Sequence, residues 1–151
     1  SQDWRPTAYM AGAYSHPEAR VRLIHATSQS CAAAHLLRMG YPVLAPVPMG
    51  HFICEYTALD RGFDTWGETC RTMLSVADCM VVFYSTTLAD SHGVDVEIGW
   101  AAKWHTPIIL MRAVAVDNML VGDYSDYTYT FERLDVPAWY RLRNEKAESH
   151  V

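Results

Sequence analysis

The stretch that decides the fold runs from Cys79 to Met111 and reads CMVVFYSTTLADSHGVDVEIGWAAKWHTPIILM. Its first residues, 79–84, form an apolar run typical of a buried strand. A polar loop at 85–93 follows, and the sequence of 94–104 then predicts a helix. Residues 107–111 form a second apolar run. Because a strand, a crossing helix and a second strand follow one another, this stretch favours parallel pairing.

The same alternation precedes this stretch. Residues 7–11 predict a strand that ends at Gly12, residues 17–39 a long helix, and residues 42–47 a second strand. Together they make the first β-α-β unit. The residues expected to recur on one face of the long helix are Val21, Ile24, Ser28, Cys31 or Ala32, and His35 or Leu36.

The ends of the long helix and the segment beyond it also carry signals. Ser15 and Glu18 fit a capping box, and Gly40 fits a C-terminal stop. Residues 48–65 are rich in Pro, Gly, His and aromatic residues and predict a binding loop or lid. Residues 66–77 predict a second helix.

These elements predict an α/β protein. We expect a single domain over residues 1–151, built on a single doubly wound, flavodoxin- or Rossmann-like parallel sheet of about five strands with helices on both faces. The rest of the chain predicts a short helix near 117–121, a strand at 127–131 and a charged last helix.

Composition narrows the function classes. Of 151 residues, 50% are hydrophobic and 19% are charged, which predicts a globular domain with a substantial core. The net charge of −5 argues against a nucleic acid polymer as partner. No apolar run approaches the ~20 residues of a membrane span, and no secretion signal opens the chain, so we expect a cytoplasmic protein without a membrane partner. The four cysteines lack metal-site spacing, and we predict no metal.

The candidate site residues lie where parallel strands end. In an open parallel sheet, ligands bind beyond the carboxyl ends of the strands. Neither a dinucleotide fingerprint nor a phosphate loop is present. The candidate site residues in or beside these loops are Tyr14, Ser15, His16, His51, Ser91, His92, Gly93, Asp95 and Glu97.

Glu97 is the leading catalytic candidate. It lies on the opening turns of the expected helix, where free N–H groups and the positive dipole end would keep its carboxylate ionised. Such a carboxylate can attack an electrophilic carbon or stabilise a developing cation. The alternative is that Glu97 only complements the dipole and that Ser91 is only a cap.

Five segments carry a family resemblance. They are YMAGAY at 9–14, GYPVLAP at 40–46, ADCMVV at 77–82, SHGVDVEIGWA at 91–101 and PIIL at 107–110. In this order they resemble the nucleoside 2-deoxyribosyltransferase superfamily, including the related nucleoside 5'-monophosphate N-glycosidases.

The resemblance implies roles for the site residues. Glu97 would attack the anomeric C1' of the sugar, Tyr14 would position sugar or nucleophile, and Ser91 would contact a 5'-phosphate. It also implies a homodimer or larger assembly with a shared site, and no cofactor. Residues 49–66 would close over the base. The further substrate-binding candidates are Gly12, Ala13, Ser15, Arg20, His51, Gly93, Asp95 and Asn118.

The chain departs from the family pattern at Cys70, where an Asp is usual. Asp64, Glu68 or Asp95 are the candidates to replace that carboxylate. We therefore predict hydrolysis of the N-glycosidic bond of a nucleoside 5'-monophosphate to free base and sugar 5-phosphate. The alternatives are base exchange between deoxynucleosides, favoured by Asn118, and a nucleotide-binding protein without catalysis, favoured by Cys70.

Overall fold

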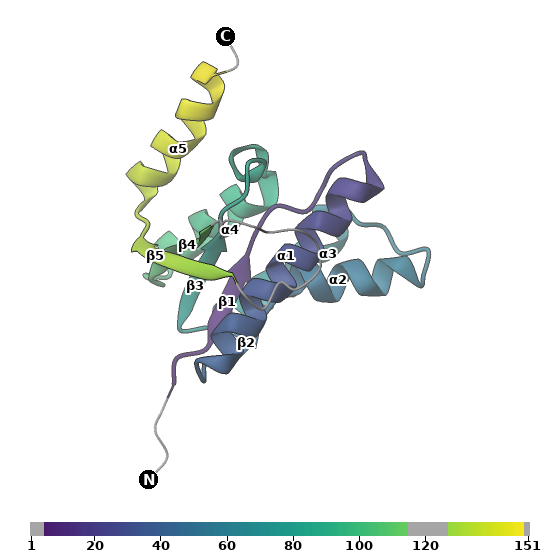
Figure 1. Cartoon of the computed structure of the whole chain (residues 1–151), viewed down its shortest axis with the longest axis horizontal. Coiled ribbons are helices and arrows are strands. Elements are labelled where there is room, and N and C mark those ends of the chain that lie inside the picture. The colour runs from purple at the N-terminus through teal and green to yellow at the C-terminus, as the bar shows by residue number, and fades with distance from the viewer. Residues whose placement is uncertain (1–4, 115–126, 150–151) are drawn as a thin grey trace.

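The computed structural model describes residues 5–114 and 127–149. Their strands form one sheet in the order β2-β1-β3-β4-β5 (Figure 1). The four strands β1 to β4 pair in parallel, whereas β5 pairs antiparallel to β4. The expectation of a fully parallel sheet is therefore wrong at this edge. The strands are β1 (Ala8–Ala11), β2 (Val43–Leu44), β3 (Cys79–Phe83), β4 (Ile108–Val114) and β5 (Thr128–Arg133).

Helices pack on both faces of this sheet. Alternate residues of β1 point to opposite faces, so Tyr9 joins a core cluster with α3, α4 and α5, while Met10 joins a cluster with α1. The helices are α1 (Ala19–Arg38), α2 (Pro46–Glu55), α3 (Phe63–Val76), α4 (His92–Lys103) and α5 (Val136–Ser149), with a short 3-10 helix, η1 (Leu88–Asp90).

The helix predicted at 94–104 and the strands predicted at 7–11, 79–84 and 107–111 are confirmed to within a few residues. The predicted helix at 117–121 lies outside the described residues. In the described ranges, no helix combines the length and the hydropathy that a bilayer crossing requires.

The prediction of a loop at residues 48–65 is wrong for most of this segment. Most of it is helical, because α2 begins at Pro46 and continues to Glu55, which leaves β2 only two residues long. Proline is favoured in the first turn of a helix, where its missing N–H is not needed. Only the stretch between α2 and α3 remains irregular.

The buried face of α1 also differs in part from the expected one. In its first half the helix is rotated by about one residue from the expected face, and Ile24 is 51% exposed, whereas Ala32 and Leu36 are buried as expected. The proposed capping box is absent, since Glu18 is the N-cap and no side chain caps this helix end within the described residues. The predicted stop is confirmed: Gly40 has φ +92°, and Tyr41 N donates to Leu36 O. The buried residues of α1 are His25, Ala26, Gln29, Ala32, Ala33 and Leu36.

A glycine is required at position 12 because α1 turns the Gln29 side chain inward against it. A Cβ atom built at Gly12 would lie 2.5 Å from the side-chain atoms of Gln29, which is itself 2% exposed. Replacing Gly12 by any other residue must therefore displace a buried side chain.

We expect Gly12→Ala to lower the free energy of unfolding by about 1–3 kcal/mol, because the new methyl group overpacks this contact. Urea denaturation followed by circular dichroism measures the change. Gly99→Ala on α4 is the matched control, since a Cβ there meets nothing within 4 Å, and it should stabilise the helix by roughly 0.5–1 kcal/mol. Equal stabilities of Gly12→Ala and the parent would contradict the expectation.

Candidate functional site

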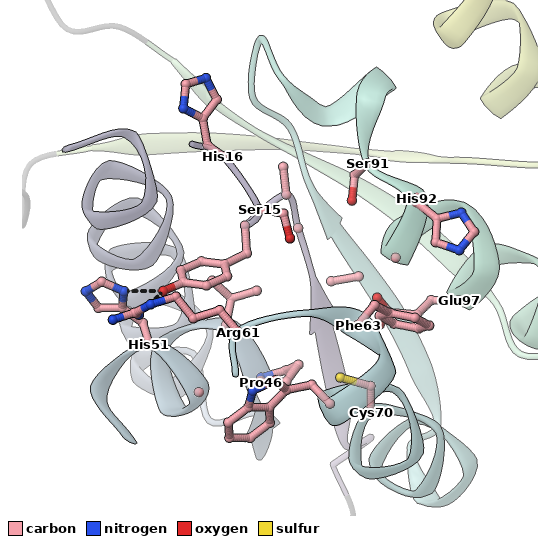
Figure 2. A pocket seen from close by; sticks show the side chains of 18 of the residues that line it. Ser15, His16, Pro46, His51, Arg61, Phe63, Cys70, Ser91, His92 and Glu97 are labelled. Carbon is pink, nitrogen blue, oxygen red and sulfur yellow. Dashed lines mark hydrogen bonds between the residues drawn. The ribbon is translucent and has the colours of Figure 1, made fainter. Parts of the chain in front are cut away.

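A pocket of about 440 Å³ lies at the carboxyl ends of β1, β2 and β3 (Figure 2). This is the edge at which the sequence placed the site, and the volume falls in the usual range for small-molecule ligands. The pocket brings together most of the predicted site residues. Those that line it are Gly12, Ala13, Tyr14, Ser15, His16, His51, Ser91, His92, Gly93 and Glu97.

The loop after β1 is held by side chains of α1. These side chains belong to Arg22, His25 and Gln29, which are three or four residues apart and therefore share one face of the helix. Each side chain bonds to a carbonyl of the loop: Gln29 Nε2 to Ala13 (2.8 Å), His25 Nδ1 to Tyr14 (3.0 Å) and Arg22 Nη1 to His16 (2.6 Å). The loop that carries Tyr14 and Ser15 is thereby fixed at successive points.

Glu97 lies on the pocket wall but is only 5% exposed. Its Oε2 atom is buried and finds no hydrogen-bond partner in the described part of the chain. Burial raises the pKa of Glu97 to about 7, although the neighbouring Tyr9 hydroxyl acts in the opposite direction. The expectation that the helix start keeps Glu97 fully ionised is therefore wrong. The residue is five positions beyond the first helical residue, where the dipole effect has fallen off.

Tyr9 and Cys70 are two titratable residues on which the Glu97 charge acts. Burial and the Glu97 charge raise the pKa of Cys70 to about 11, so its thiol is protonated at neutral pH. Burial, followed by the Glu97 charge, also raises the pKa of Tyr9. The carboxyl group thus sits beside two neutral side chains. Sequence analysis did not single out Tyr9, because an apolar strand position gives no sign of it.

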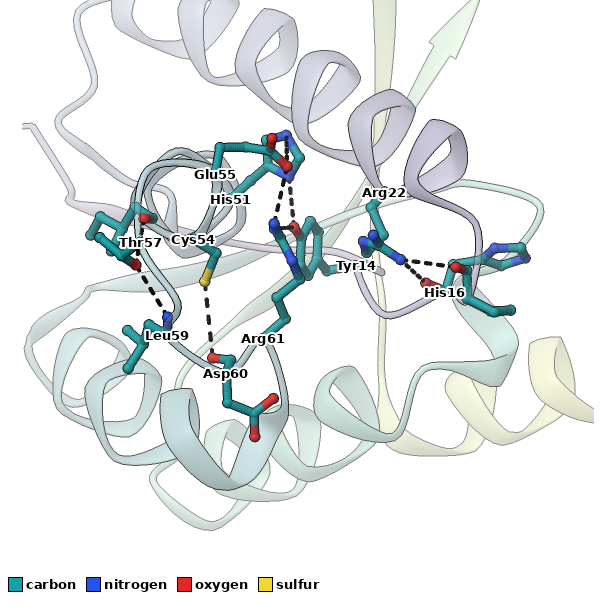
Figure 3. A network of polar contacts seen from close by, with 12 residues as sticks. Tyr14, His16, Arg22, His51, Cys54, Glu55, Thr57, Leu59, Asp60 and Arg61 are labelled. Carbon is teal, nitrogen blue, oxygen red and sulfur yellow. Dashed lines mark hydrogen bonds and ion pairs between the residues drawn. The ribbon is translucent and has the colours of Figure 1, made fainter.

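Polar side chains form a network on the other side of the pocket from Glu97 (Figures 2 and 3). Arg61 Nη1 donates to Tyr14 Oη at 2.7 Å, and the Tyr14 hydroxyl is 2.6 Å from His51 Nδ1. Arg61 Nη2 also pairs with Glu55 Oε1 at 3.1 Å. This network ties the loop after β1 to α2 and to the segment that follows it. Arg61 was not predicted individually.

Two aromatic side chains at the start of α3 complete the wall. Phe63 and Trp66 both line the pocket. Glycines allow the close approach of Phe63, since a Cβ at Gly67 or Gly93 would lie 3.1 Å from its ring. The same ring stacks on Trp100 at 6.1 Å, and Trp100 packs against the core. Flat apolar surfaces of this kind suit an aromatic ligand.

Ser91 caps a helix and also lines the pocket. Its Oγ accepts a hydrogen bond from Val94 N at 3.2 Å, so it is the N-cap of α4. It also lines the pocket, where its hydroxyl hydrogen remains available to donate. The N-terminus of α4 presents further backbone N–H groups, which favour an anion.

Two predicted substrate contacts lie elsewhere. Asp95 does not line the pocket: its Oδ1 accepts from Trp139 Nε1 at 2.9 Å and pairs with Arg143 at 2.8 Å. Two residues along a helix correspond to a turn of about 200°, so Asp95 and Glu97 face nearly opposite directions. Arg20 is exposed and lines a separate groove between α1 and α2. The predicted contact at Asn118 lies outside the described residues.

The candidate replacements for a second carboxylate are also corrected. Asp64 and Glu68 are exposed on α3 and do not line the pocket. Among the lining residues of the described chain, the carboxylates are Glu97 and Asp90, and Asp90 was not predicted. No group of three or more His, Cys, Asp or Glu in residues 5–114 and 127–149 is arranged to hold a metal ion.

The fold and the pocket define a mixed α/β protein with a ligand-sized site at the carboxyl edge of its parallel strands. The chain belongs to the family described as a domain of unknown function, DUF1937, whose model matches residues 5–113. This match covers β1 to β3, all of β4 except its last residue, and every residue that lines the pocket. No curated protein matches the sequence.

The raised pKa of Glu97 predicts a pH-dependent stability. The folded state holds the proton up to about pH 7 and the unfolded state releases it near pH 4.5, so stability is full below pH 4.5 and falls as pH rises through 7. We expect Glu97→Gln to remove this loss, which amounts to roughly 3 kcal/mol. Urea denaturation of both proteins from pH 4.5 to pH 8.5 measures it. Parallel stability profiles would contradict the assignment.

Proposed function

We propose that this protein hydrolyses the N-glycosidic bond of a nucleoside 5'-monophosphate and releases free base and sugar 5-phosphate. The observation that carries the proposal is the buried Glu97 Oε2, which has no hydrogen-bond partner among the described residues and lies in the wall of a pocket of about 440 Å³. The family resemblance of residues 91–101 adds to it. The strand order β2-β1-β3-β4-β5 supports the proposed doubly wound, flavodoxin-like class.

Glu97 is the proposed nucleophile. Its ionised carboxylate attacks C1', the C1'–N bond breaks with its electron pair going to the base, and a glycosyl ester forms. The departing base takes a proton from a neighbouring acid or from water. Water then attacks C1', the ester bond breaks, and Glu97 returns as a carboxylate. A pKa of about 7 leaves a useful fraction of Glu97 ionised at neutral pH.

The rest of the pocket suits the other parts of a nucleotide. Phe63 and Trp66 offer ring faces to a base, and Ser91 with the α4 N-terminus offers donors to a phosphate. Tyr14 is held by Arg61 and His51 and can position the sugar. No cofactor takes part in this scheme, and water is the second substrate.

A panel of ribo- and deoxyribonucleoside 5'-monophosphates, scored by chromatography for released base, tests the proposal. We expect Glu97→Gln to lower turnover at least a hundredfold, because an amide is a poor nucleophile, while nucleotide binding persists. Glu68→Gln is the matched control, since Glu68 is exposed outside the pocket, and it should retain full activity. An active Glu97→Gln protein would refute the role of Glu97.

The rate should also follow the ionisation of the nucleophile. Because only the carboxylate attacks C1', kcat/KM is expected to rise with pH and to level off above a pKa of about 7. Initial rates at limiting nucleotide from pH 5 to pH 9 give this profile. A rate that falls over the same interval would show that protonated Glu97 is the active form.

Two alternatives remain as proposals. The neutral Cys70 thiol beside Glu97 favours a nucleotide-binding protein without turnover, which ligand-induced thermal stabilisation with no base release would reveal. Base exchange, favoured by Asn118, would give a swapped nucleoside when a nucleoside and a second free base are incubated together. The proposed homodimer or larger assembly is tested by light scattering after gel filtration.

A further inference from the structure

His25 is a buried polar side chain that links two walls of the pocket. It is 4% exposed, and its position on α1 lies beneath the loop after β1. Its Nδ1 atom is 3.0 Å from the carbonyl of Tyr14, and its Nε2 atom is 2.7 Å from Thr87 Oγ1. Tyr14, in the loop after β1, and Thr87, in the loop after β3, both line the pocket.

The partners of His25 fix where its proton lies. A carbonyl oxygen only accepts hydrogen bonds, so Nδ1 must carry a hydrogen and donate it to Tyr14 O. Burial lowers the pKa of His25, so the ring is neutral at pH 7. A neutral imidazole carries one hydrogen, which leaves Nε2 as an acceptor. Thr87 must therefore donate its hydroxyl hydrogen to His25.

The direction of the next hydrogen bond follows. Ser85 Oγ is 3.1 Å from Thr87 Oγ1, and either hydroxyl group could in principle be the donor. Because Thr87 has already used its only hydrogen on His25, Ser85 is the donor here. The chain of donors runs from Ser85 to Thr87, then to His25, and ends at the Tyr14 carbonyl. Thr87 keeps one lone pair, so it can only accept from a ligand.

We infer that Thr87 determines specificity by accepting a hydrogen bond from a hydroxyl group of the bound sugar, and that His25 is the positioning residue that turns the Thr87 hydroxyl for this purpose. The sugar as ligand rests on the proposed function, whereas the directions of the hydrogen bonds do not. A phosphate oxygen is a hydrogen-bond acceptor, as is the remaining lone pair of Thr87. The two would repel each other, so Thr87 disfavours a phosphate. Ser91, whose hydroxyl can donate, takes the phosphate instead.

The tautomer of His25 is tested without any ligand. Nitrogen-15 chemical shifts of the imidazole side chains at pH 7.5, assigned with His25→Gln, should show a neutral ring with hydrogen on Nδ1 and none on Nε2. A ring with hydrogen on Nε2, or a charged ring, would overturn the donor chain. This result stands or falls independently of whether the protein is an enzyme.

The role of Thr87 is tested by binding. Dissociation constants are measured for ribo-, 2'-deoxy- and 3'-deoxynucleoside 5'-monophosphates in the Glu97→Gln background, so that no turnover interferes. We expect Thr87→Val to weaken binding of the nucleotide that has the recognised hydroxyl by about five- to tenfold, and to leave the analogue without it unchanged. Thr87→Ser, which keeps the hydroxyl, is the matched control and should bind like the parent. His25→Gln should lose the same discrimination.

The possible outcomes separate the two proposals. Equal weakening across the panel, or none, overturns the role of Thr87 while the nucleotide site survives. Binding of no nucleotide by the parent overturns the sugar ligand and the proposed function together, although the tautomer result remains. Melting temperatures of each variant identify any loss of binding that comes from misfolding.

Discussion

The hydrogen bonds from α1 to the loop after β1 are the constraint on which the pocket depends. That loop leaves the sheet inside the protein, where carbonyl groups without partners would be costly. Gln29, His25 and Arg22 meet these carbonyls from one helix face. The helix can present them only by turning Ile24 outward, and Gly12 must lack a side chain to make room for Gln29. The polar side chains that hold this pocket wall therefore occupy inward positions of α1, while the apolar Ile24 is exposed.

Glu97 shows how burial and helix position compete. A carboxylate near a helix N-terminus gains a fraction of a kcal/mol from the dipole, and this gain fades after the first turn. Loss of water acts on the whole charge, and at 5% exposure it dominates. The resulting pKa of about 7 depends on apolar and neutral neighbours. Cys70 is one of these neutral neighbours, because its protonated thiol adds no second negative charge beside Glu97.

The sequence was informative where one local signal was enough. The apolar run at β3, the N-cap at Ser91 and the glycine at 40 placed their elements correctly, and the strand-end rule located the pocket. It failed where the answer depends on distant partners. The antiparallel pairing of β5 and the ion pair of Asp95 with α5 are set by tertiary contacts. In the first half of α1 the inward residues His25 and Gln29 are polar, so the apolar pattern pointed to the neighbouring Ile24 instead.

Tyr14 is where the two polar networks of the pocket meet. Its carbonyl accepts from His25, and its hydroxyl oxygen accepts from Arg61, which has no acceptor to offer. The Tyr14 hydroxyl also lies 2.6 Å from His51 Nδ1, and the other ring nitrogen of His51, Nε2, is 3.8 Å from Glu55 Oε1. Both ends of Tyr14 are fixed before any ligand arrives. A ligand must match donors and acceptors that are already set, and this pre-set polarity selects among ligands of equal size.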